Sequence, residues 1–197
     1  GYTNPVMIKT AVPLPAASWA PQTQLKSKND SRAVVWEAAL PVGYDPSDLG
    51  LRYQLWRGST RQTLARSPDL QYVHANKENI TFKSRDILST YYDFESVHLV
   101  LYESWTASYH RLTSVDATNH VAVLASPFNN QWANQASGSR YYIENCREEM
   151  DEIGEFYVDA KNQKVLYTAA AGDDLRKSTA ENLFWLSAGP RELVVLR

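Results

Sequence analysis

The feature that most constrains the fold of this chain is a succession of short apolar runs, many of which alternate with polar residues. Residues 32–40, 51–56, 96–102 and 107–115 each have the length and pattern of a β-strand. Clusters of Gly, Pro, Asn, Asp and Ser separate the runs, as expected for turns. Because helical periodicity is scarce, the pattern predicts roughly nine or ten short strands and an all-β fold, an antiparallel β-sandwich.

The second half of the chain adds one helix and a hairpin to this prediction. Residues 143–152 are largely polar and end at Gly154, which predicts one short helix. Residues 155–158 and 164–168 flank a connection rich in turn formers and predict a β-hairpin. The apolar tail 193–196 predicts one more buried strand.

Length and charge limit the number of domains and the partners. The chain has 197 residues, of which 44% are hydrophobic, so we expect one β-sandwich domain over residues 1–197. Lys and Arg number 20 and Asp and Glu number 22, which gives a net charge of −2. This balance argues against nucleic acid or an anionic membrane surface as partner. The longest apolar runs, such as 121–125, are too short to cross a bilayer.

The cysteine and asparagine residues bear on the compartment. The single cysteine, Cys146, rules out an internal disulfide. Asn29 and Asn79 each begin a tripeptide that matches the N-glycosylation pattern, which favours a secreted or extracellular protein. The first residues have no charged-then-apolar leader, and we expect the chain to be a piece excised from a larger protein.

No group of residues has a spacing typical of a catalytic or metal site. The four histidines are widely separated and no phosphate-binding glycine loop is present, so we expect neither metal nor cofactor. The acids between Glu144 and Glu155 are the only candidates for catalysis, since glycoside hydrolysis needs two carboxylates. A charged run on a short helix is usually its solvated face, and we therefore expect no catalytic residue in this chain.

Aromatic residues are better candidates for binding than the acids. They make up 12% of the chain. Trp132 lies beside Asn130 and Gln131 in a polar loop, where a ring can cover the apolar face of a sugar while amides bond its hydroxyl groups. Trp105 lies at a predicted turn and is a second candidate, although a ring there is expected to fold back onto the sheet.

The segment 140–167 carries a distinctive order of residues: Arg140, Tyr141, Tyr142, Glu144, Asn145, Asp151, Gly154, Glu155, Phe156, Tyr157 and Asp159. In this order and spacing it resembles a segment of right-handed parallel β-helix proteins of the glycoside-hydrolase type. Phe156 stands where tryptophan is usual in that family. Two weaker segments, 64–69 and 97–116, agree in order and spacing, so that the resemblance covers most of residues 36–174.

The resemblance implies a β-sandwich inserted between coils of a β-helix that carries the catalytic acids. The expected function is then a non-catalytic accessory domain, either structural or shaping a substrate cleft, with the β-helix domain of the parent protein as partner. An independent carbohydrate-binding module that binds a glycan is the alternative, and a free-standing glycosidase is a third. Within the segment we expect Arg140 to pair with a carboxylate such as Glu155, and Gly154 to let the chain reverse.

Overall fold

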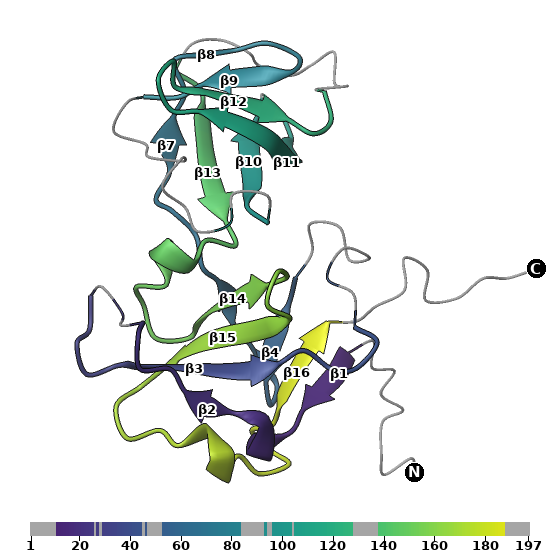
Figure 1. Ribbon diagram of the computed structural model, residues 1–197, viewed down its shortest axis with the longest axis vertical. Helices are drawn as coiled ribbons and strands as arrows, with labels where there is room; N and C mark the ends of the chain where they lie inside the picture. The colour runs from purple at the N-terminus through teal and green to yellow at the C-terminus, as the bar shows by residue number, and fades with distance from the viewer. Residues whose placement is uncertain are drawn as a thin grey trace, which may run out of the picture.

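The regular secondary structure of the described residues consists mainly of β-strands, as Figure 1 shows for the computed structural model. The structure describes residues 11–25, 27, 29–44, 46, 53–83, 93, 96–103, 105–127 and 138–187. The described 3-10 helices are η1 (Ala16–Ser18), η4 (Arg147–Glu149) and η5 (Leu175–Lys177). The predicted all-β class is therefore confirmed. No helix in these ranges is long and apolar enough to span a bilayer.

The strands gather into two lobes (Figure 1), and the lower lobe is a sandwich of two sheets. One sheet has the order β1 (Ala11–Leu14), β16 (Phe184–Ser187), β4 (Leu55–Arg57) and β5 (Thr60–Arg61). The other has the order β2 (Ala20–Pro21), β3 (Val34–Ala39), β15 (Lys164–Ala169), β14 (Glu155–Asp159) and β6 (Thr63–Leu64). A common core that includes Leu55 and Phe184 from the first sheet and Trp36 and Val158 from the second fills the space between them.

The upper lobe is one bent sheet of seven strands. Its order is β7 (Leu70–Gln71), β13 (Arg140–Glu144), β10 (His98–Tyr102), β11 (Ala107–Asp116), β12 (Val121–Leu124), β9 (Asn79–Thr81) and β8 (His74–Ala75). The pairing of β11 with β12 shifts register between Leu112 and Ser114, and such a bulge bends a strand. The sheet thus encloses its own core, which joins Leu99 and Ile143 to Ile80 and Ala122.

In the sequence, the segment that forms the upper lobe lies between the segments that form the lower lobe. Its strands all lie between Leu70 and Glu144, whereas the lower lobe takes strands from before and after that segment. The chain passes from β6 to β7 on the way up and from β13 to η4 on the way down (Figure 1). Backbone hydrogen bonds from Cys146 to Ala65 and from Ser67 to Ile143 hold the two passages together.

The hairpin prediction is confirmed and the helix prediction is wrong. Strands β14 and β15 pair in antiparallel register from Phe156–Tyr167 to Asp159–Lys164. Residues 143–144 belong to strand β13 because Ile143 is buried in the upper core opposite Leu99, and only η4 is helical in the predicted range. Asn145 lies between β13 and η4 and has a φ of 56°. This left-handed backbone conformation ends the strand. The predicted tail strand at 193–196 lies outside the described residues.

Candidate functional site

Two acids of the segment 140–167, Glu155 and Asp159, bond to backbone N–H groups. The Glu155 carboxylate, which is 6% exposed, accepts hydrogen bonds from the backbone N–H groups of Asp151 (2.7 Å) and Glu152 (2.9 Å). Burial raises the pKa of Glu155, although these two bonds oppose the shift. The Asp159 carboxylate accepts both the backbone and the side-chain N–H of Asn162 and so closes the turn of the hairpin. Both acids therefore stabilise turns.

Asn145 connects the two lobes through a fully buried side chain. Its Nδ2 donates to the carbonyl of Ser96 and to that of Val158, each at 3.1 Å. Its Oδ1 accepts from the backbone N–H of Val158 at 2.9 Å. Ser96 leads into β10 of the upper lobe, and Val158 lies in β14 of the lower lobe. We call Asn145, Glu155 and Asp159, with the backbone groups that they bond, the corner.

A buried histidine lies near the corner. His98 is fully buried, its Nδ1 lies 3.5 Å from Oε1 of Glu144, and its ring stacks on that of Tyr53 with centroids 5.1 Å apart. Burial lowers the pKa of His98, and the neighbouring Glu144 only partly offsets this effect. The lowered pKa favours the neutral imidazole, and the stack on Tyr53 joins β10 of the upper lobe to the core of the lower lobe.

The expected pairing of Arg140 with Glu155 is wrong. Arg140 begins β13 at the end far from the corner, and its Nη1 lies 3.3 Å from Asp69. Glu155 begins β14 in the lower lobe and is held by backbone instead. The prediction for Gly154 is confirmed, since its φ of 92° is a left-handed conformation that glycine adopts at little cost.

The strands β13, β10 and β11 carry aromatic and charged side chains on the side of the sheet away from the core. Side chains alternate along a strand. Leu99, Leu101, Tyr141 and Ile143 point into the upper core, so Tyr142, Val100 and Tyr109, which are opposite one another in register, point outward. We call this surface the outer face; it comprises Arg66, Asp69, Tyr102, Tyr109, Arg140 and Tyr142.

Two guanidinium groups lie on two tyrosine rings of the outer face. The Cζ of Arg66 lies 4.1 Å from the centre of the Tyr142 ring, and that of Arg140 lies 4.7 Å from the centre of the Tyr102 ring. The two rings contact each other, with centroids 5.7 Å apart. Cation–π contacts of this kind contribute about 0.5–1 kcal/mol each at an exposed site. They help to fix the positions of both guanidinium groups over the rings.

The charges of the outer face do not cancel. Arg66 and Arg140 share one carboxylate, because Asp69 accepts from Arg66 at 3.2 Å through one oxygen and from Arg140 at 3.3 Å through the other. Each guanidinium has five N–H donors, so this one carboxylate uses a minority of them. The side chains of Arg66 and Arg140 are 40% and 61% exposed, and Tyr109 is 48% exposed. By alternation Glu144 and Arg111 lie on the same side of the sheet, which therefore carries three arginines against two carboxylates beside the accessible ring.

Of the residues predicted to bind carbohydrate, the described part of the chain contains Trp105 alone. Trp132, Asn130 and Gln131 lie outside the described residues. Trp105 follows β10 and is 87% exposed, so its ring does not fold back onto the sheet. The outer face was not predicted from the sequence. Arg140 and Tyr142 are two residues apart in one strand, and this spacing could have placed these two side chains on the same side of the sheet.

The two glycosylation candidates differ in their surroundings. Asn29 is exposed in the connection between β2 and β3. Asn79 is half-buried in β9, pairs with β12 and keeps its Oδ1 buried. Only Asn29 thus has the accessibility that attachment of a glycan requires.

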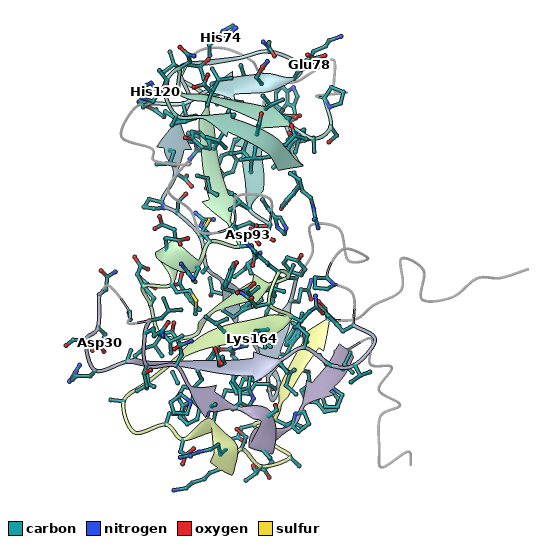
Figure 2. All side chains as sticks on the ribbon, viewed as in Figure 1. Asp30, His74, Glu78, Asp93, His120 and Lys164 are labelled. Atoms are coloured by element: carbon teal, nitrogen blue, oxygen red, sulfur yellow. The ribbon has the colours of Figure 1, made fainter. Side chains whose placement is uncertain are left out.

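His74, His98 and His110 lie on β8, β10 and β11, and His120 lies in the turn before β12. Figure 2 places His74 and His120 at the end of the upper lobe far from the lower lobe, while Asp93 lies where the lobes meet. Within the described ranges no group of three or more His, Cys, Asp or Glu could hold a metal ion.

Comparison with known proteins gives one structural similarity. No family model matches the sequence, and no curated protein matches it. A solved structure named "Glycoside hydrolase" superposes with a TM-score of 0.60 at 18% sequence identity. The match covers 89% of this chain and 31% of that chain, so the present sequence spans less than a third of that protein's length. At this identity the similarity shows the fold alone.

Proposed function

We propose that this chain is a non-catalytic accessory domain of a larger carbohydrate-active protein. The observation that carries the proposal is the extent of the structural match. Nearly all of this chain, 89%, corresponds to less than a third of a protein named glycoside hydrolase. A domain that forms part of a larger carbohydrate-active enzyme would give this proportion. The resemblance of residues 140–167 to β-helix proteins supports the same reading.

The use of the acids at the corner supports a role without catalysis. A retaining or inverting glycosidase needs two carboxylates that face each other across the sugar. Glu155 and Asp159 instead bond backbone groups in two separate turns. Glu148 is held by the neighbouring Arg147 at 3.3 Å.

A hydrolysis assay tests this proposal. The 197-residue chain is incubated with neutral and acidic polysaccharides, and released reducing ends are measured. We expect no release above a heat-denatured control. Hydrolysis that Glu148→Gln or Glu155→Gln abolishes, while Glu37→Gln leaves it intact, would show that the chain is a glycosidase. Glu37 is a suitable control because it lies on β3 and pairs with Lys164 at 2.7 Å.

The proposed partner is a right-handed parallel β-helix domain in the same polypeptide. The sequence of the transcript on both sides of these residues tests this directly. We expect short apolar strands repeating at a constant interval, as in stacked coils. Flanking sequence with helical periodicity, or with no repeat, would contradict this partner.

An independent carbohydrate-binding module is the second candidate function, and the exposure of Trp105 favours it. A ring that is 87% exposed can stack on a sugar without rearrangement of the sheet. Calorimetric titration with neutral oligosaccharides tests it. We expect Trp105→Ala and Trp132→Ala each to weaken binding, whereas titration without heat, or binding unchanged in both variants, would eliminate this candidate.

We also propose secretion, on the basis of the exposed sequon at Asn29. When the chain is expressed through a secretory pathway, we expect a single N-glycan that a peptide N-glycosidase removes. Asn29→Gln should abolish the resulting mass shift and Asn79→Gln should leave it unchanged. A shift that persists in Asn29→Gln would contradict the assignment.

A further inference from the structure

We infer that the outer face binds an anionic polysaccharide, with Arg66 and Arg140 as the groups that recognise its carboxylate or sulfate substituents. This inference rests on the proposed carbohydrate-related function and names the class of glycan. It concerns residues 66, 69, 102, 109, 140 and 142, which come from strands or connections far apart in the sequence. Pairing of β7, β13, β10 and β11 brings them onto one surface.

The geometry favours an anionic sugar over a neutral one. A neutral sugar stacks on an exposed aromatic face, but here guanidinium groups lie over the rings of Tyr142 and Tyr102. What these two sites offer to a ligand is therefore the outward edge of a guanidinium. That edge matches the planar, two-oxygen geometry of a carboxylate or two oxygens of a sulfate.

The arginines are held in place before a ligand arrives. Each is fixed by a ring on one side and by Asp69 on another, so little side-chain freedom remains to be lost on binding. Tyr109, opposite Val100 on the next strand, is 48% exposed and supplies an aromatic surface for a sugar ring alongside the charges. A repeating acidic polysaccharide supplies both a charge and a ring in each unit.

The net charge of the chain makes the inference specific. At −2 overall, the protein has no general attraction for a polyanion. Binding of an acidic glycan must then depend on a local excess of positive charge. The two arginines around the single carboxylate of Asp69 provide that excess.

The experiment measures binding of the full 197-residue chain to polygalacturonate, dextran sulfate and neutral dextran by calorimetry at low ionic strength. We expect binding to one or both charged polymers and none to dextran. The first polymer carries carboxylates and the second sulfates, so the two arms identify the substituent. Added salt should weaken the interaction because both charged partners are solvent-exposed.

Two matched variants locate the binding surface. Arg66→Gln/Arg140→Gln should weaken binding at least about tenfold, since each arginine can donate charge-assisted hydrogen bonds. Arg32→Gln/Arg61→Gln removes the same charge from exposed positions of the lower lobe and should bind like the parent. Equal losses in the two double variants would overturn the inference.

A variant that is expected to gain affinity excludes unfolding as the explanation of the weaker binding. Asp69→Asn removes the carboxylate that occupies both guanidinium groups, so affinity for the charged polymer should rise. Affinity that falls or stays constant would contradict the inference. Binding of a single-stranded oligonucleotide as tight as that of the polysaccharides would also overturn it, because charge alone would then suffice.

Absence of glycan binding by the outer face and failure of the accessory-domain proposal would give different experimental results. If neither charged polymer binds and no polysaccharide is hydrolysed, the outer face has a different role and the accessory-domain proposal stands. If the chain hydrolyses a polysaccharide, the accessory-domain proposal falls whatever the outer face binds.

Discussion

The corner and the outer face both carry polar side chains, but these side chains bond to different partners. At the corner, Asn145 makes three hydrogen bonds to backbone and is fully buried. Tyr142 lies only three residues before Asn145, in β13, but it belongs to the outer face, where the guanidinium group of Arg66 lies over its ring. The corner directs its polar atoms at the chain itself, whereas the outer face directs guanidinium donors at solvent.

This difference shows where a polar motif serves structure and where it can bind a ligand. Buried polar groups must be bonded, and backbone groups are the nearest partners when a chain turns sharply. Exposed guanidinium groups are stabilised by water and can exchange it for a ligand's oxygen atoms. Substitutions at Asn145, Gly154, His98 and Glu155 test whether these residues serve stability rather than binding.

Substitution of the central residue of the corner should have the largest effect on stability. Asn145→Ala leaves the N–H and carbonyl of Val158 and the carbonyl of Ser96 without their partner. We expect the free energy of unfolding to fall by about 3 kcal/mol or more, because unsatisfied buried groups cost about 1–3 kcal/mol each. Urea denaturation measures it. On the outer face, Arg140→Gln should change the free energy of unfolding by less than about 1 kcal/mol. Equal losses in the two variants would contradict the different roles assigned to the corner and the outer face.

The second largest loss of stability is expected from substitution of Gly154 in the turn before β14. Gly154→Val places a β-branched residue at a φ of 92°, and we expect a loss of about 2 kcal/mol or more. Gly154→Asn should recover part of that loss, because asparagine tolerates left-handed φ values better than valine. Both variants should bind anionic glycans like the parent. A valine variant that melts at the parent's temperature would contradict the role assigned to Gly154.

The buried histidine predicts a pH dependence of stability. The pKa of His98 is lowered below 6.5 in the folded protein, so the unfolded chain binds its proton first as the pH falls. Stability should therefore decrease as the pH drops below about 6.5. His98→Phe, which can keep the stack on Tyr53, should lose part of this dependence, and His74→Phe on exposed β8 should keep it. Thermal melts between pH 7 and 5 compare them; identical slopes would contradict the prediction.

The smallest effect is expected at Glu155. Burial raises its pKa above the usual 4.5, so the folded state binds its proton first and gains stability as the pH falls through that raised pKa. Glu155→Gln keeps an oxygen that can accept from Asp151 and Glu152 and removes the buried charge. We expect a melting temperature at pH 7 no lower than the parent's. A marked loss would mean that the charge itself is needed at the corner.

Local patterns carried most of what could be predicted from the sequence. Turn formers between residues 159 and 163 predicted the hairpin, and Gly154 predicted a reversal, because both depend on nearby residues. The helix prediction failed since Ile143 is held by pairing with Leu99, which polarity along 143–152 does not reveal. The outer face depends on register between four strands, so Arg66 and Tyr142 cannot be brought together from their spacing alone.

The nesting of the lobes has a consequence for synthesis on the ribosome. Strands β7 to β13 lie together along the chain, so the upper lobe can close as soon as β13 has emerged. Strand β3 must wait for β15, and Glu37 is separated from its partner Lys164 by 127 residues. Strand β1 waits longer, until β16 is made. Distant pairings form slowly and leave strand edges exposed meanwhile. Strands β1 and β3 thus find these partners only after the upper lobe can close, and their edges stay exposed for longer.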